Sequence, residues 1–356
     1  MVELAAIFRQ HGAEYQRKYG ERMPSSHLRA LRDIQRCRTE ELGGQVYHCD
    51  QCKQYRYSYH SCKNRHCPKC QNDQANAWLK TQKGLLLPVI HFMVTFTLPA
   101  ELRAVARSHQ KTVYNILFRA SAQALEKLAR DPRFIGARIG MVGVLHTWTR
   151  ALLYHPHVHY IVPAGGLDAD GKWRASRQDF LVHAKPLRMI FRAKVRDQLK
   201  KAGLFSLVDK PVWKKPWVVD LEPVGSGQEA FRYLAPYIFR VAISNNRILK
   251  LEDGWVTFQY KQSATDQIRT SRVTAEEFIR RFLQHVLPKG FVKVRYQGLL
   301  APSNRHLLNR ARQLLVANSL DSNALEKDPE VAPRRPNCGT LLVLIKTLKP
   351  KSRPPP

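Results

Sequence analysis

The stretch His155-Pro156-His157-Val158-His159-Tyr160-Ile161-Val162 decides the fold of this chain. Alternate residues of a β-strand point to the same face, so the three histidines would project together while the apolar residues enter a sheet core. Two imidazoles at positions i and i+2 can bind one divalent cation through neutral ring nitrogens. A lone histidine would fit an ordinary half-buried strand, but three in alternation predict a metal site.

The segments around this strand predict an α+β fold. Residues 89–98 alternate polar and apolar side chains like a strand, residues 101–129 repeat apolar side chains with helical spacing, and residues 139–146 read as another strand. Such elements form an antiparallel sheet with helices packed on it. A third metal ligand would be His146, which ends the strand expected to pair with the histidine strand, or His155, which shares its face. The sequence leaves both open.

The charge of the chain indicates a polyanionic partner. Lys and Arg number 59 against 28 Asp and Glu, a formal net charge of +31. This excess points to nucleic acid. No apolar stretch approaches the ~20 residues of a membrane span, and no secretory signal is recognisable at the N-terminus. We therefore expect a cytoplasmic protein with no membrane partner.

A cysteine-rich block predicts a structural zinc site. Cys49 and Cys52 form one CxxC pair, and Cys67 and Cys70 form a second after residues 53–66. Two such pairs can converge on one tetrahedral zinc, which would supply folding energy to so short and polar a segment. We expect one zinc on these four cysteines. Ligand exchange or a second metal stays open, because two further potential ligands lie inside the block, Cys62 and His66.

Basic and aromatic residues are interleaved in two places, as in surfaces that contact phosphates and stack on bases. The cysteine block carries Arg65 and Lys69 beside several tyrosines. The segment 210–217 carries Trp213, Lys214 and Lys215, and it could grip single-stranded DNA. A surface turn held by prolines, with a tucked tryptophan, explains the second segment equally well.

A tyrosine pair provides candidate nucleophiles. After a capping box at residues 226–229, Tyr233 and Tyr237 fall on a different helical face from the apolar residues, with Arg240 near them. A phenol needs a polarised phosphorus and help in losing its proton before it can attack. Pro236 between the two tyrosines would bend the helix. Amphipathic tyrosines at an interface are the structural alternative.

Taken in order, these motifs resemble the insertion-sequence 91 family of transposases, the two-tyrosine rolling-circle group of the HUH endonucleases. The motifs that carry the resemblance are Ser61-Cys62-Lys63-Asn64-Arg65-His66-Cys67-Pro68-Lys69-Cys70-Gln71, Phe92-Met93-Val94-Thr95-Phe96-Thr97-Leu98-Pro99, His155-Pro156-His157-Val158-His159 and Tyr233-Leu234-Ala235-Pro236-Tyr237. The resemblance spans residues 5–315 and includes 277–283 and 287–291.

The resemblance implies a site and a chemistry. His157 and His159 would bind Mg2+ or Mn2+, and Tyr233 and Tyr237 would attack DNA phosphodiesters to give a 5′-phosphotyrosine link. One departure lies in the tail, where members often carry another CxxC pair. Arg335 takes the place of its first cysteine, which leaves Cys338 alone, so a second zinc site is not expected there.

The expected organisation is linear. It comprises an N-terminal helical segment (1–45), a zinc-binding domain (46–80), an HUH nuclease domain (88–250), a basic DNA-binding region (251–320) and a disordered tail (321–356). The apolar run Leu341–Leu348 is an unexplained interruption of that tail.

These observations predict a transposase that nicks and rejoins single-stranded DNA at the ends of its element. It would use Mg2+ or Mn2+ for catalysis and structural zinc for folding. Alternatives are a replication initiator or relaxase with the same chemistry, and a zinc-dependent DNA-binding protein without catalysis. A metallohydrolase lacks support, since Ile161 stands where its aspartate would be, and a transposase using three carboxylates would leave the histidines unexplained.

Overall fold

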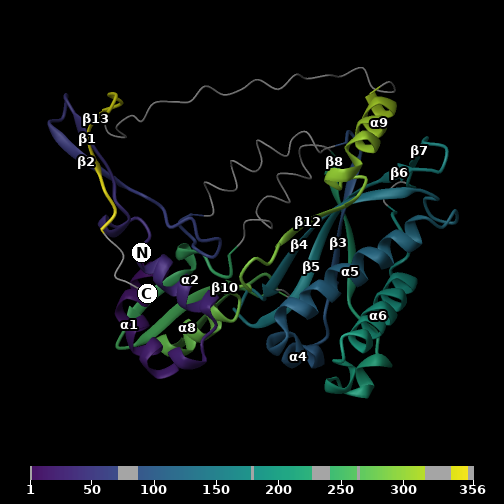
Figure 1. Cartoon of the computed structure of the whole chain (residues 1–356), viewed down its shortest axis with the longest axis horizontal. Coiled ribbons are helices and arrows are strands. Elements are labelled where there is room, and N and C mark those ends of the chain that lie inside the picture. The colour runs from purple at the N-terminus through teal and green to yellow at the C-terminus, as the bar shows by residue number, and fades with distance from the viewer. Residues whose placement is uncertain are drawn as a thin grey trace. The chain divides into compact units, whose positions relative to one another are not determined.

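A computed structural model describes residues 2–70, 87–177, 180–226, 241–262, 265–316 and 338–351 (Figure 1). The chain forms two compact units, and each contains separate stretches of sequence. The first unit comprises 1–73, 243–286 and 323–356, and the second comprises 74–242 and 287–322. This division is interleaved, whereas we expected consecutive regions. The region expected at 251–320 is divided between the two units.

The second unit is built on an antiparallel sheet of seven strands. The order is β7-β6-β4-β5-β3-β8, and β12 also pairs with β4. This architecture confirms the predicted α+β fold class. The strands are β3 (Ile90–Thr97), β4 (Arg138–Trp148), β5 (Tyr154–Pro163), β6 (Gly165–Leu167), β7 (Trp173–Ala175), β8 (Val219–Ser226) and β12 (Val294–Gly298).

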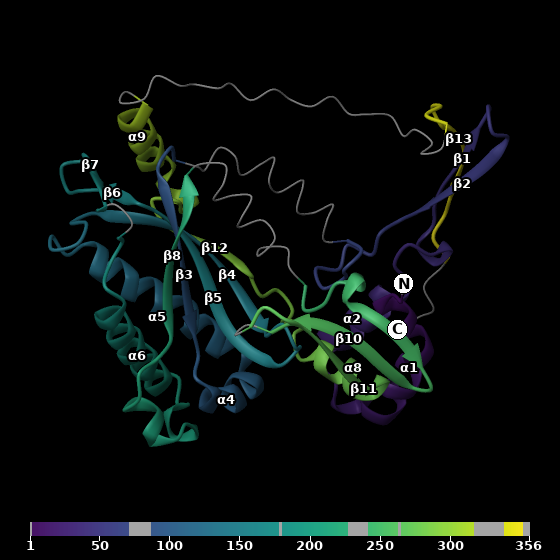
Figure 2. The same cartoon turned by 180° about the vertical axis from the view of Figure 1, so that it is seen from behind.

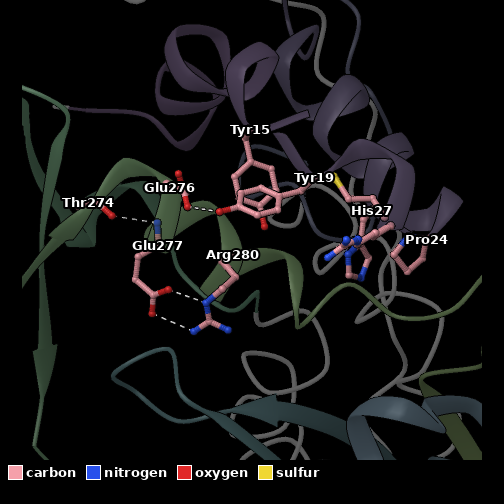
Figure 3. Close-up of a pocket in the computed structure, with 10 residues that line it drawn as sticks. Tyr15, Tyr19, Pro24, His27, Thr274, Glu276, Glu277 and Arg280 are labelled. Carbon is pink, nitrogen blue, oxygen red and sulfur yellow. Dashed lines mark hydrogen bonds and ion pairs between the residues drawn. The ribbon is translucent and has the colours of Figure 1, made fainter. Parts of the chain in front are cut away.

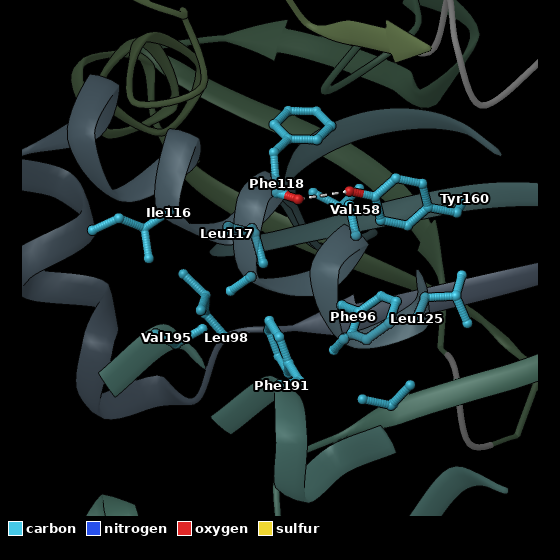
Figure 4. Close-up of a cluster of buried hydrophobic side chains, with 14 of the residues drawn as sticks. Phe96, Leu98, Ile116, Leu117, Phe118, Leu125, Val158, Tyr160, Phe191 and Val195 are labelled. Carbon is cyan, nitrogen blue, oxygen red and sulfur yellow. Dashed lines mark hydrogen bonds between the residues drawn. The ribbon is translucent and has the colours of Figure 1, made fainter. Parts of the chain in front are cut away.

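Helices α5 (Gln110–Ala129) and α6 (Ala184–Lys201) cover one face of this sheet. The main hydrophobic core lies between this face and the two helices (Figure 4). Phe96 of β3 meets Phe191 of α6 edge-on, with ring centroids 4.9 Å apart. Tyr160 of β5 is fully buried and donates its hydroxyl hydrogen bond to the Phe118 carbonyl on α5, at 3.1 Å. Since these residues face the helices, their strand neighbours face the opposite side.

The long helix expected over 101–129 is divided in two. Helix α4 (Arg103–Ser108) ends at His109, whose φ of −124° and ψ of 47° are not helical, and α5 begins at Gln110. The Ser108 hydroxyl donates to the carbonyls of Ala104 and Val105. Such side-chain bonding competes with the regular helical hydrogen bonds. The spacing of apolar residues gave no sign of this break, so the sequence predicted one continuous helix.

The first unit contains helices α1 (Leu4–Tyr19) and α2 (Ser25–Gln35), a sheet of order β11-β10-β9, and helix α8 (Ala275–Leu283). Phe8 of α1 and Phe282 of α8 make an edge-on contact with centroids 5.4 Å apart. The sheet strands are β9 (Ile248–Glu252), β10 (Trp255–Lys261) and β11 (Ile268–Thr274).

A second three-stranded sheet in this unit pairs distant parts of the sequence, in the order β13-β1-β2 (Figure 2). It consists of β1 (Gly44–Cys49), β2 (Gln54–Tyr59) and β13 (Val343–Leu348). The prediction of disorder was therefore wrong for this part of the tail. The apolar run Leu341–Leu348 contains a strand, and its partner β1 is almost 300 residues away in the sequence.

The second unit also contains helix α9 (Arg305–Val316). The other described elements are short 3-10 turns: Gly20–Arg22, Glu40–Leu42, Ala100–Leu102, Phe205–Leu207, Lys210–Trp213, Asn245–Arg247 and Pro302–Asn304. Among the described residues, no helix has the length and apolar character needed to cross a membrane.

Candidate active site and metal centres

Three histidines meet on the face of the second unit's sheet that is opposite α5 and α6. His146 on β4 is the register partner of His157 on β5, and Val144 is the partner of His159. One nitrogen of each imidazole lies within 4.8 Å of those of the other two. His146 and His159 are buried and His157 is half-buried. The three rings can therefore offer nitrogen ligands to one cation.

Neighbouring groups orient two of these rings. His157 Nδ1 lies 2.7 Å from the carbonyl oxygen of His155, and His159 Nδ1 lies 2.8 Å from Thr95 Oγ1. An imidazole with its hydrogen on Nδ1 satisfies both contacts and has its lone pair on Nε2. Metal-binding histidines are held in this way by partners of the second ring nitrogen. The donor set and its orientation therefore fit a divalent cation.

The structure distinguishes the two candidates for a third ligand. His155 is not part of the cluster, and its Nδ1 lies 3.0 Å from the guanidinium of Arg103. Burial and this neighbouring cation lower the pKa of His155, and a fixed cation beside it opposes metal binding. His146 lies with the predicted pair instead.

Strand β8 brings two carboxylates to the same sheet face, and the sequence-based reasoning had missed them. Asp220 is the register partner of Thr95, and Glu222 is the partner of Met93. Burial, then the proximity of Asp220, raises the pKa of Glu222. The alternation of polar and apolar residues over 219–222 could have predicted their position. Val219 and Leu221 pack against the core, so the two acidic residues face the opposite side of the sheet.

The candidate nucleophiles Tyr233 and Tyr237, and Arg240, lie outside the described residues. Tyr160, next to the histidine cluster in sequence, is tied to the core by its hydrogen bond to Phe118. Burial raises its pKa, which makes it unsuitable as a nucleophile.

The cysteines form two clusters instead of the single predicted site. Cys67 and Cys70 lie with Cys37 and Cys62, whereas Cys49 and Cys52 lie with Cys338. The prediction that both CxxC pairs share one zinc was therefore wrong in its pairing. Cys49 and Cys52 lie at the turn of the β1–β2 hairpin, and Cys67 and Cys70 follow the opposite end of β2. The length of this hairpin separates the two pairs.

The first cluster has the geometry of a tetrahedral zinc site. The Sγ atom of Cys37 lies 3.5 Å from those of Cys67 and Cys70, and Cys62 Sγ lies 3.6 Å from Cys70 Sγ. Four sulfurs at the usual Zn–S distance would be about 3.8 Å apart. Cys37 was missed as a ligand because it has no CxxC partner, although it belongs to the local group of six cysteines. His66 is not in the cluster.

The residues expected to bind DNA near the cysteines have protein partners. Lys69 Nζ lies 2.7 Å from Glu3 Oε2, and its side chain is 23% exposed. Arg65 is half-buried, and burial lowers its pKa. The exposed aromatic residues of this region are Tyr55 and Tyr57 of β2.

The segment 210–217 is a turn packed on the core. Trp213 stacks on Phe205 with centroids 5.6 Å apart, and Trp217 donates to the Val212 carbonyl. Lys215 pairs with Glu101, whereas Lys214 is exposed. The contacts of Trp213 support the alternative of a tucked tryptophan over base stacking.

The first unit also contains a pocket of about 350 Å3 between residues of α1, α2 and α8 (Figure 3). Both carboxylates that line it have basic partners: Arg280 donates to Glu277 at 2.5 and 2.9 Å, and Lys18, from outside the lining, reaches Glu276 at 2.8 Å. Burial lowers the pKa of His27 to about 4, so this imidazole is neutral near pH 7. No predicted site residue lines this pocket.

Comparison with known proteins identifies the family. A family described as "Putative transposase" matches residues 140–307, and one described as "Transposase zinc-binding domain" matches residues 7–98. The "Putative transposase y4qJ" of Sinorhizobium fredii is 39% identical over 340 residues, covering 90% of this chain and 83% of that protein. The "Transposase for insertion sequence element IS801" of Pseudomonas savastanoi pv. phaseolicola is 29% identical over 286 residues, covering 74% and 68%.

Among solved structures, the metal-bound complex of the conjugative relaxase TrwC with oriT DNA is a distant likeness. The sequences are 16% identical, the TM-score is 0.29, and the match covers 65% of this chain and 73% of that one. The metal-free complex gives 15% identity and a TM-score of 0.28, covering 65% and 74%. The two domain matches and the identity with the y4qJ protein along most of its length show that the chain belongs to the insertion-sequence 91 family of transposases.

Proposed function

We propose that this transposase cuts and rejoins single-stranded DNA at the ends of its element through a covalent phosphotyrosine link. Tyr233 and Tyr237 would be the nucleophiles, and His146, His157 and His159 would hold a divalent metal. The observation that supports this proposal is the histidine cluster, with its three ring nitrogens within 4.8 Å of one another. The proposed DNA partner agrees with the net charge of +31.

The proposed reaction exchanges one phosphodiester bond for another. The tyrosine oxygen attacks phosphorus, a bond forms between them, and the bond from phosphorus to the 3′ oxygen breaks. The phenol loses its proton, and the departing 3′ oxygen gains one to give a free hydroxyl. Because the phosphodiester energy is kept in the protein–DNA link, attack by a 3′ hydroxyl can reverse the step without ATP.

Residues of the sheet would prepare this reaction. Thr95 and the His155 carbonyl hold the imidazoles of His159 and His157, so the ligands are oriented before DNA arrives. A divalent cation bound there would withdraw charge from the scissile phosphate. Glu222 has a raised pKa and lies on the same sheet face, which makes it a candidate acceptor for the phenol proton.

Recognition of the element ends would involve the zinc-binding region, the basic C-terminal part and Arg240. We propose that Cys37, Cys62, Cys67 and Cys70 hold a structural zinc ion. Tyr55 and Tyr57 present exposed rings on β2, which suits base stacking. Lys214 is exposed and available to a phosphate. Arg65 and Lys69 would contact DNA only by changing their present partners.

A covalent-adduct assay tests the proposal. Purified protein is mixed with labelled single-stranded oligonucleotides spanning the flanks of its gene, with Mn2+ or with EDTA, and is run on a denaturing gel. We expect a metal-dependent shifted band that Tyr233→Phe, Tyr237→Phe or their combination removes. Tyr15→Phe is the matched control and should retain the band.

Three outcomes would count against parts of the proposal. Adduct formation by the double tyrosine variant would exclude these nucleophiles. Tight binding to the flanks without any adduct would favour the zinc-dependent DNA-binding protein. An adduct on double-stranded flanks alone would contradict the single-strand assignment while leaving the tyrosine chemistry in place.

A further inference from the structure

The second cysteine cluster brings together residues that are far apart in the sequence, Cys49, Cys52 and Cys338. Cys49 ends β1, Cys52 lies in the turn that leads to β2, and Cys338 lies just before β13. Their Sγ atoms lie within 4.8 Å of one another, and the atoms of Cys49 and Cys338 are 3.7 Å apart. A disulfide would require about 2.05 Å, whereas sulfurs sharing a tetrahedral zinc lie about 3.8 Å apart.

The backbone after these cysteines has an unusual and repeated conformation. Lys53 follows Cys52 with φ of 52°, and Gly339 follows Cys338 with φ of 70°. The same left-handed conformation follows two cysteines of the first cluster, at Arg38 and Lys63, with φ of 55° and 52°. It costs a non-glycine residue about 1–2 kcal/mol. The same turn conformation therefore follows cysteines in both clusters.

At two of these four turns, after Cys338 and Cys62, the conformation accompanies a backbone hydrogen bond to the cysteine sulfur. The backbone N–H of Thr340 hydrogen-bonds to Cys338 Sγ, while the Thr340 hydroxyl donates to Gln51 Oε1. In the first cluster, the backbone N–H of Asn64 bonds to Cys62 Sγ, again from two residues further along. Donors aimed at sulfur stabilise its thiolate, which is the form that binds metals. The Cys338 turn is therefore built like a turn of the first cluster.

The tail beyond Cys338 is fitted closely to the first unit. Gly43 has φ of 67°, and a Cβ there would lie 2.4 Å from the Leu348 carbonyl oxygen, so no side chain fits. Lys351 reaches Glu40 at 2.5 Å. Yet every residue of β13 except Leu348 is exposed, so apolar burial contributes little to holding this strand.

We propose that Cys49, Cys52 and Cys338 form a second zinc centre that fastens β13 to the β1–β2 hairpin. Three thiolates provide three of the four tetrahedral positions, and a water molecule or another non-cysteine ligand takes the fourth. Metal binding then supplies the free energy that burial does not, and the folded hairpin recruits the tail. This centre is independent of the histidine cluster and of the tyrosine chemistry.

Zinc content and hydrogen exchange of the full-length protein test this centre. Both are measured after gel filtration in a reducing buffer, in a His157→Ala background so that the histidine cluster does not add zinc. We expect Cys338→Ser to hold one zinc per chain fewer than its parent. Cys338→His, which keeps a zinc ligand, should restore the content. Amides of 343–348 should be protected in the parent and in Cys338→His, and should exchange faster in Cys338→Ser.

Several results would overturn the proposal. Equal zinc content in Cys338→Ser and its parent would remove the second centre. Unchanged exchange of 343–348 despite the loss of one zinc would show that the metal does not fasten the strand. A disulfide between Cys49 and Cys338, found by mass spectrometry of the reduced preparation, would replace the metal explanation. Cys67→Ser is the matched control. It should lose the zinc of the first cluster and keep the zinc bound by Cys338. The amides of 343–348 should therefore stay protected.

Discussion

His146 lies directly across the strand pair from His157, with ring centroids 5.5 Å apart. Because cross-strand partners point to the same face, β4 adds a third imidazole to the two that β5 presents through alternation. The site thus depends on one register between two strands. A slip by one residue would turn one strand's histidines into the core.

Replacing His146 by alanine should weaken Mn2+ binding more than about 100-fold. Loss of an indirect partner of a metal ligand usually costs about 10–100-fold, and a direct ligand should cost more. Titration calorimetry with Mn2+ on the full-length protein measures the change. His155→Ala is the matched control and should bind Mn2+ within a few-fold of the wild type, because Arg103 holds that ring. Equal losses in both variants would show that His146 has no special role.

Replacing Thr95 by valine should reduce Mn2+ affinity by about 10–100-fold while leaving the fold intact. Valine has the shape of threonine but cannot hydrogen-bond to His159 Nδ1, so the imidazole loses its fixed orientation. The same titration measures affinity, and circular dichroism checks the fold. Serine at this position retains the hydroxyl and should recover most of the affinity. Full affinity in the valine variant would contradict the assigned orientation.

Replacing Gly143 by alanine should destabilise the second unit by about 1–3 kcal/mol, the usual cost of overpacking a core. A Cβ at this position would lie 2.4 Å from Cε1 of Tyr160, and that ring is fixed by its hydrogen bond to Phe118. Urea unfolding followed by fluorescence measures the loss. Gly20→Ala is the control, since its nearest neighbour is the flexible Gln16 side chain at 3.3 Å. An unchanged midpoint for Gly143→Ala would mean that the ring can move aside.

Buried His91 should make the second unit less stable in acid. Burial lowers its pKa to about 4, from 6.5. The unfolded chain therefore binds the proton more readily, so this contribution is complete above pH 6.5 and decreases as the pH falls towards 4. A shift of this size corresponds to about 3 kcal/mol. His91→Asn can still donate to the Val89 carbonyl, as His91 Nδ1 does at 2.9 Å. The free energy of unfolding of this variant, measured with urea, should change less between pH 6.5 and 4 than that of the wild type. An equal change in both proteins would contradict this role.

Local patterns in the sequence were sufficient to predict the histidine strand and the α+β class, because strand alternation and helical spacing act over a few residues. They were insufficient for the cysteines. Cys338 meets Cys49 only because β13 pairs with β1, and no local pattern encodes a pairing over that separation. The same absence of local signal made the tail look disordered. Asp220 and Glu222 were missed because their place beside Thr95 depends on the register of β8.

Replacing Cys37 by serine should cost the protein one zinc and unfold the segment 60–70, which supplies the other three ligands of that cluster. Its sulfur lies 3.5 Å from both Cys67 and Cys70, so its loss leaves three ligands in a site whose binding energy contributes directly to folding. Zinc content and limited proteolysis of residues 60–70 measure the two effects. Cys37→His can still bind zinc and should retain more of both. If the serine variant keeps its zinc and its resistance to protease, then Cys37 is a packed thiol and the first centre has a different fourth ligand.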